Sequence, residues 1–322
     1  MSISGWTYTF VSTLQRFSRN KGNDMAATLT YYTVLAVFPA LLALVSLLRL
    51  SGIEDLVIPW LTELLGSVST DQAFNQTVVG IVQGFFSRSG ATFGLAAGVL
   101  TAAWAASGYV AAFSRAMNRI YGVVEGRNPI KLKASQFGIT IVLLVGMALL
   151  LLAMVLSGRV ADWLTGNSQY LGGVVQVWQW LRWPLIIVLV IGLISVLYYV
   201  CPNVRFPRFR PLSYGAIVAT LTALIAVAGF SFYASNFGSY DVTYGALAGA
   251  IIALWLVWLI NLALIIGAHL DLEVLRSRQL MQGLPAEREP MLRLKNSAGV
   301  SKKTRQQNKI AAKGNRLRLG GQ

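Results

Sequence analysis

Few residues of this sequence could carry catalytic or metal chemistry. It contains one cysteine, Cys201, and one histidine, His269, 68 positions apart. Zinc and di-metal enzymes take several Cys, His or carboxylate ligands, which this pair does not supply. A single cysteine also excludes an intrachain disulfide. His269 and Glu273 share a helical face, but two ligands are too few for a metal, and we expect Glu273 to pair with Arg276 three residues further on.

Short motifs that carry a known mechanism are also absent. The chain has no G-x-x-x-x-G-K-[ST] phosphate loop, no G-x-S-x-G nucleophile motif, no C-x-x-C and no H-E-x-x-H. With one histidine, neither a Ser-His-Asp triad nor a multi-histidine nuclease site is convincing. We therefore predict no catalytic residue, no metal and no cofactor, and we expect a protein that is not an enzyme.

The polar residues within the long apolar segments are uncharged. One cluster begins the first apolar segment and is followed by Pro39, and a second, rich in tyrosine, ends the fifth segment. Two interpretations stay open: an aromatic belt at the membrane interface, or a polar groove that contacts lipid headgroups. We expect the lone amide of Asn261 to hydrogen-bond a neighbouring helix. The candidate groove residues are Thr30, Tyr31, Tyr32, Thr33, Pro39, Tyr233, Asn236, Tyr240, Asp241, Tyr244 and Asn261.

Composition identifies the elements that carry these residues as membrane helices. Of the 322 residues, 55% are hydrophobic and only 12% are charged, where a soluble globular chain carries about 25% charged residues. Six windows free of Asp, Glu, Lys and Arg are long enough to cross the hydrocarbon core of a bilayer. The predicted fold is an all-α integral membrane protein, a bundle of six transmembrane helices with interfacial amphipathic helices. The predicted membrane domain covers 28–270, with spans at 28–50, 91–113, 136–158, 183–201, 212–235 and 245–268.

The distribution of positive charge predicts the orientation of the bundle. Four segments, 1–27, 114–135, 202–211 and the tail after 268, hold 23 of the 27 basic residues. Because short cytoplasmic loops are rich in Lys and Arg, these segments should face the cytoplasm, and both termini with them. The net charge of +15 then reflects topology and attraction to anionic lipid rather than binding of nucleic acid.

Three further segments do not span. Residues 1–27 form an N-terminal cytoplasmic segment with an amphipathic helix on the inner leaflet, and 51–90 form an outside amphipathic region. Residues 271–322 form a basic cytoplasmic tail that should be disordered from about residue 290. For that tail we favour a solvated segment over a polybasic contact with lipid or RNA. The N-terminal helix presents Trp6, Phe10, Leu14 and Phe17 on one face, with Arg16, Arg19 and Lys21 at the headgroup level.

An ordered set of short motifs resembles the BrkB/YihY family over about residues 5–280. One position departs from the pattern: the family commonly has Glu-Leu-Asn after Gly267-Ala268, where this chain has His269-Leu270-Asp271, so any role tied to that glutamate is in doubt. The matching residues are Ala27-Thr28-Leu29-Thr30-Tyr31-Tyr32-Thr33 with Phe38-Pro39; Asn118-Arg119-Ile120-Tyr121-Gly122 with Glu125; Tyr198-Tyr199 with Pro202-Asn203; and Phe232-Tyr233, Phe237, Tyr240 and Tyr244-Gly245.

The resemblance implies a multi-pass protein of the bacterial inner membrane. Family members have been labelled serum-resistance factors and, as "ribonuclease BN", tRNA-processing enzymes, and the family has been linked to envelope lipids. We expect a transporter-like protein that handles lipid or another amphiphile in the cell envelope. The alternative is a non-transporting structural or assembly partner of an envelope complex. We disfavour a tRNA-processing ribonuclease because the metal ligands are missing, and we expect membrane lipids and envelope proteins, not nucleic acid, as partners.

Overall fold

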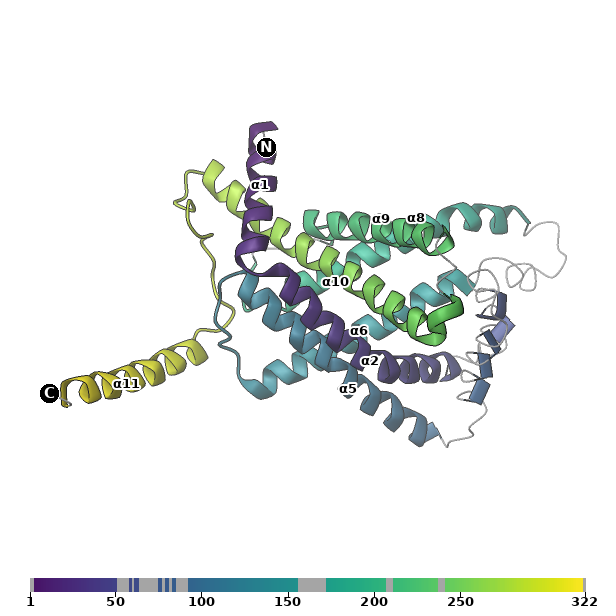
Figure 1. Ribbon diagram of the computed structural model, residues 1–322, viewed down its shortest axis with the longest axis horizontal. Coiled ribbons are helices and arrows are strands. Elements are labelled where there is room, and N and C mark those ends of the chain that lie inside the picture. The colour runs from purple at the N-terminus through teal and green to yellow at the C-terminus, as the bar shows by residue number, and fades with distance from the viewer. Residues whose placement is uncertain are drawn as a thin grey trace. The chain divides into compact units, whose positions relative to one another are not determined.

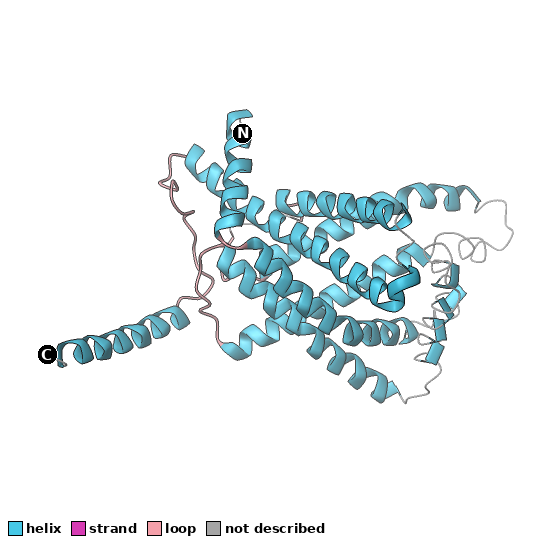
Figure 2. Cartoon of the chain, viewed as in Figure 1, coloured by secondary structure: helices cyan, strands magenta, loops and turns pink. Residues whose placement is uncertain are grey.

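The computed structural model shows an all-helical chain, as the sequence predicted. It describes residues 3–50, 92–155, 172–206, 211–236 and 241–320, and short helical stretches between 58 and 84. Within these residues there is no strand, only a single antiparallel bridge between Val204 and Leu294. The main helices, seen in Figures 1 and 2, are α1 (Ile3–Arg19), α2 (Gly22–Leu50), α5 (Thr92–Ile120), α6 (Pro129–Val155), α8 (Gly172–Val200), α9 (Tyr214–Asn236), α10 (Asp241–Met281) and α11 (Ala298–Gly320).

Several of these helices can cross a membrane. Among the described residues, three stretches are both long and apolar enough, Pro129–Met154, Trp180–Val200 and Ala253–Met281, and a shorter apolar helix covers Tyr214–Phe230. Each of the six predicted spans is helical over most of its described residues. Large apolar side chains on these helices point outward, as Ile225 does with 73% of its surface exposed. Outward apolar surface of this kind suits contact with lipid tails.

Helix α10 is longer than a bilayer requires. Its 41 residues correspond to a length of about 60 Å, twice the hydrocarbon thickness of about 30 Å. It ends at Met281, where Gly283 has a φ of 74° and the amides of Gly283 and Leu284 bond back to the carbonyls of Leu280 and Gln279. This is a Schellman ending, which requires a left-handed residue at that position. The helix therefore continues well past the predicted end of the last span at 268.

The chain forms two compact units. Unit 1 comprises Met1–Leu29, Ala111–Gln136 and Ser195–Gln322. Unit 2 comprises Thr30–Val110 and Phe137–Ile194 and has a small core of Ala102, Ala103 and Leu144, with Ala40 and Phe137 against it. Unit 1 thus collects all four segments that the charge pattern assigned to one side of the membrane, and they bond to one another there, as described below.

Within unit 1, α10 packs against α9 and α1 (Figure 1). Helices α9 and α10 approach each other closely at Gly215 and Gly267. A Cβ atom on either residue would collide with the backbone carbonyl of the other. On α1 the buried side chains are the polar ones, Thr9 and Thr13 among them, whereas Trp6, Phe10 and Leu14 are exposed. Trp6, Phe10 and Leu14 of the predicted apolar face are therefore available for lipid, whereas Phe17 of the same face is half-buried and packs against His269. The polar face of α1 contacts protein.

We predicted disorder for the tail from about residue 290, and the structure describes the following contacts and helix there. Residues 284–297, which we call the C-terminal strap, run over other parts of unit 1: the amide of Arg205 donates to the carbonyl of Arg293, and that of Lys295 to the carbonyl of Asn203. Residues 298–320 then form the exposed helix α11. The prediction inferred disorder from a lack of apolar residues, but Lys, Arg, Gln and Ala favour a helix without a core.

Candidate functional site

The predicted groove residues near the start of α2 adopt different environments. Thr30 is buried, whereas Tyr31 is 61% exposed, and the rings of Tyr31 and Tyr32 meet edge to face with centroids 5.4 Å apart. Thr33 and Pro39 are half-buried. These contacts suit both an aromatic belt and a groove, so the groove at this end stays a prediction.

The other groove candidates lie mostly outside the described residues. Tyr240 is not described, and neither are the side chains of Tyr233, Asn236, Asp241 and Tyr244; the outside region 51–90 is described only in short stretches. Asn261 is buried in α10, where its amide donates to the carbonyl of Val257, four residues earlier in the same helix, at 3.0 Å.

The side chains of α10 at His269 and Glu273 are structural. The ring Nδ1 of His269 lies 2.8 Å from the carbonyl oxygen of Ile265, which can only accept, so this nitrogen carries the proton. Glu273 is fully buried between two guanidinium groups: Arg276 Nη1 lies 3.0 Å from one carboxylate oxygen, and Arg16 Nε lies 2.5 Å from the other. The predicted pair with Arg276 is confirmed. Arg16, which we expected at the headgroup level, is buried against Glu273.

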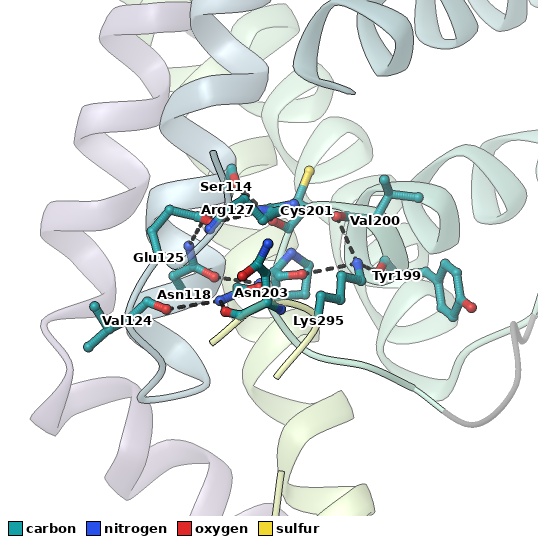
Figure 3. Close-up of polar contacts among 12 residues, drawn as sticks. Ser114, Asn118, Val124, Glu125, Arg127, Tyr199, Val200, Cys201, Asn203 and Lys295 are labelled. Carbon is teal, nitrogen blue, oxygen red and sulfur yellow. Dashed lines mark hydrogen bonds and ion pairs between the residues drawn. The ribbon is translucent and has the colours of Figure 1, made fainter. Parts of the chain in front are cut away.

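A polar clasp joins the loops of unit 1 and consists of Ser114, Asn118, Glu125, Arg127, Asn203 and Lys295 (Figure 3). Arg127 forms a two-pronged pair with Glu125, with Nε–Oε1 at 2.8 Å and Nη2–Oε2 at 2.7 Å. The same Nη2 donates to the carbonyl of Cys201 at 2.7 Å. Guanidinium groups suit such planar, bidentate contacts. Arg127 therefore ties the loop after α5 to the end of α8.

Asn203 and Lys295 complete the clasp. The Asn203 side chain is fully buried: its Nδ2 donates to the carbonyls of Val124 and Asn296, both at 3.0 Å, and its Oδ1 accepts from the amide of Asn296 at 3.1 Å. The Lys295 ammonium donates to the carbonyls of Tyr199, Val200 and Pro202. Burial and then the charge of Arg127 lower the pKa of Lys295 to about 8. A cation in this position neutralises the negative end of α8.

Glu125 gives the clasp a dependence on pH. Burial opposes ionisation of its carboxylate, but bonds from Arg127 and Asn118 outweigh that cost and lower the pKa of Glu125 below its ordinary value. A carboxylate with a lowered folded-state pKa contributes stability that is present above its unfolded pKa, near 4.5, and is lost as the pH falls through the folded value.

We therefore expect Glu125→Gln to lower the thermal midpoint of the detergent-solubilised protein at neutral pH. The difference from the wild type should stay constant above about pH 5 and shrink as the pH falls further below about 4.5, because the folded wild-type carboxylate becomes protonated only below that value. Glu63→Gln, at a position outside the clasp, is the control. A difference that stayed constant below about pH 4.5 would contradict the assignment.

A cavity of about 120 Å³ lies beside the clasp in unit 1. Its walls are mainly aromatic: the ring of Phe206 lies 5.7 Å from those of both Tyr121 and Tyr199. Burial and then the carboxylate of Asp271 raise the pKa of Tyr121, so its hydroxyl stays neutral. The lining residues are Tyr121, Ser195, Tyr198, Tyr199, Phe206, Ser213, Tyr214, Asp271, Val274, Leu275 and Arg278.

Two charged side chains of α10 line this cavity. Asp271 accepts a hydrogen bond from the amide of Gly215 at 2.8 Å, at the start of α9. The Arg278 guanidinium lies over the ring of Tyr214, 5.2 Å from its centroid. Polarity inside the predicted spans gives no signal for this site. Tyr198, Tyr199 and Asp271 do lie in the short motifs described above, but they were not predicted as site residues.

The described residues hold no cluster of three His, Cys, Asp or Glu side chains that could bind a metal ion. The cavity offers groups that can recognise a ligand: aromatic faces, one carboxylate and one guanidinium.

Comparison with known proteins places the chain among membrane proteins. The family described as "Virulence factor BrkB" matches residues 13–291. A "ribonuclease-like protein YfkH" of Bacillus subtilis is 28% identical over 270 residues, 80% of this chain and 91% of that protein. A "UPF0761 membrane protein" of Haemophilus influenzae is 25% identical over 80% of this chain and 91% of its own length, and one of Vibrio campbellii is 28% identical over 83% and 82%. No solved structure gives a significant match.

Proposed function

The chain belongs to the BrkB family of membrane proteins, and from this premise we propose that it is a six-span protein of the bacterial inner membrane that handles lipid or another amphiphile. The observation that carries this proposal is the aromatic cavity with Asp271 and Arg278 on its wall. It lies in a unit with outward apolar side chains, so an amphiphile can place its headgroup in the cavity and its chains in the bilayer. Both termini face the cytoplasm in this proposal.

Two features support the six-span arrangement with both termini on one side. An even number of spans returns the chain to its starting side. Within unit 1 the Arg16–Glu273 pair joins α1 to α10, and Arg16 Nη1 lies 3.8 Å from Glu289 Oε2 of the C-terminal strap. The loops after α5 and α8 bond to the same strap through Asn203 and Lys295. This grouping supports our proposal that all four basic segments face the cytoplasm, as the charge rule predicts.

The proposed function is tested by lipid movement in vesicles. Purified protein is reconstituted into liposomes that contain a fluorescent phospholipid, and a quencher that cannot cross the bilayer is added outside. Without lipid movement about half of the fluorescence is lost, because only the outer leaflet is accessible; a protein that moves lipid should raise this fraction clearly above one half.

The variants make the test specific. Leu275→Trp should fill the cavity and reduce lipid movement several-fold, whereas Leu284→Trp, outside the lining, should behave like the wild type. If the wild-type vesicles quench no further than empty ones, or if both variants act alike, the cavity does not serve lipid movement.

A second candidate is a non-transporting partner of an envelope complex, and helix α11 favours it. This helix of 23 residues carries basic and no acidic side chains, and its described side chains are exposed. An exposed basic helix can contact an acidic protein or anionic lipid. We do not extend the ribonuclease-like label of the Bacillus subtilis relative to this chain. We propose that it is not an enzyme and that the aromatic faces and the single charge pair of the cavity serve recognition.

A further inference from the structure

The cavity of unit 1 presents two opposite charges to whatever enters it. Asp271 is the acidic side chain of its lining, and Arg278 is the basic one. The aromatic rings between them also favour a cation, since the face of a tyrosine or phenylalanine ring attracts positive charge. A ligand that carried only a negative charge would meet the carboxylate, and one that carried only a positive charge would meet the guanidinium.

The distance between the two charges suits a short zwitterion. Asp271 and Arg278 are seven residues apart on α10, which places them on nearly the same face and about 10 Å apart along the axis. The Arg278 guanidinium lies over the ring of Tyr214, and the amide of the next residue, Gly215, donates to Asp271, so both charges lie beside the start of α9. An ammonium and a phosphate joined by a two-carbon linker, with a hydrogen bond of about 3 Å at each end, span a comparable length.

The size of the cavity limits the ligand further. About 120 Å³ holds a small polar group but not a drug-sized molecule, for which pockets of about 300–1,000 Å³ are usual. We propose that this cavity binds an ammonium–phosphate headgroup of the phosphoethanolamine type, with the ammonium at Asp271 and the aromatic walls and the phosphate at Arg278. The inference rests on the proposed function and names the headgroup that the amphiphile carries.

Binding is measured on the full-length protein in detergent by native mass spectrometry. The probes are dihexanoyl phosphatidylethanolamine, which has both charges, and dihexanoyl phosphatidylglycerol, which lacks the ammonium. The wild type should bind the ethanolamine lipid about tenfold more tightly, the equivalent of one charged contact. Equal binding of the two lipids by the wild type would overturn the proposal. Free phosphoethanolamine forms a third arm, and tight binding of it would identify a soluble metabolite as the natural source of the headgroup.

Single substitutions show which part of the headgroup each charged side chain binds. Asp271→Asn keeps an oxygen that can accept from the amide of Gly215, and it should abolish the preference for the ethanolamine lipid while leaving phosphatidylglycerol binding equal or stronger. Arg278→Gln should weaken both lipids. Phe206→Leu keeps a half-buried apolar side chain and should reduce the preference about two- to fivefold, because it removes a ring face. This variant tests the assignment if Asp271→Asn does not fold. A preference unchanged in Asp271→Asn contradicts the assignment.

The binding experiment tests the headgroup assignment, and the vesicle experiment tests the proposed transport, so each proposal can be refuted without the other. Selective binding without lipid movement would refute the proposed transport and leave the headgroup assignment standing. Lipid movement with no preference between the two probes would refute the headgroup assignment and leave transport standing.

Discussion

Replacing Glu273 with alanine is expected to destabilise the protein by about 3–5 kcal/mol, the usual cost of removing one partner from a buried ion pair. The Glu273 carboxylate is fully buried and contacts both Arg16 and Arg276. Without it, Arg276 keeps only the carbonyls of Ala286 and Glu287 as described hydrogen-bond partners, and Arg16 keeps only the exposed carboxylate of Glu289, 3.8 Å from its Nη1. The energetic cost should be greatest at Arg16, because its Nη2 is buried and has no hydrogen-bond partner.

The measurement is unfolding of the detergent-solubilised protein, followed by loss of the monodisperse peak on heating. Arg19→Ala, an exposed cation in the last turn of the same helix as Arg16, is the control and should change the midpoint little. Adding Arg16→Met to Glu273→Ala should recover part of the loss, since it removes one unpaired charge. A single Glu273→Ala variant as stable as the Arg19→Ala control would show that the buried pair is not formed.

The second large effect is expected at Asn203. Its side chain has three hydrogen bonds with the backbones of Val124 and Asn296, and none of the three backbone groups gains a replacement when the amide is removed. With about 1–3 kcal/mol for a buried polar group left unpaired, we expect Asn203→Ala to cost about 2–4 kcal/mol. The C-terminal strap should be released at the same time.

Release of the strap is measured by limited proteolysis of the folded protein. Asn203→Ala should be cleaved within 284–297 faster than the wild type, whereas Asn315→Ala, an exposed amide in α11, should not differ. Asn203→Asp should resemble the alanine variant, because a carboxylate would face the carbonyls of Val124 and Asn296 in place of the donating amide. Protection of the strap in both variants would contradict its attachment through Asn203.

The helices and the grouping of the basic segments could be predicted from sequence because both depend on local composition. Hydropathy over about 20 residues marks a span wherever the rest of the chain lies. The charge rule likewise counts residues close to each span, and segments as distant as Arg16 and Glu273, or Asn118 and Asn203, do meet in unit 1.

The pairings themselves could not be predicted, because they join residues far apart in the chain. Arg16 and Glu273 are 257 positions apart, and nothing around Arg16 distinguishes it from Arg19 beside it. The cavity was missed for a different reason: its polar residues lie at helix ends, where the sequence alone assigns tyrosine to an interfacial belt. The small residues that let α9 approach α10 at Gly215 and Gly267 are equally common in helices that stay apart.

Attachment of the strap to Asn203 has a consequence for biosynthesis. Asn296 follows Asn203 by 93 positions, so at about 5–20 residues per second the ribosome needs about 5 to 20 seconds between the two. During that interval the end of α8 lacks Lys295, and the Asn203 amide lacks its Asn296 partners, while the last two apolar helices enter the bilayer. Nascent chains stalled before residue 296 therefore carry carbonyl and amide groups that lack their hydrogen-bond partners. Membrane quality control can use this surface to distinguish unfinished chains from complete ones.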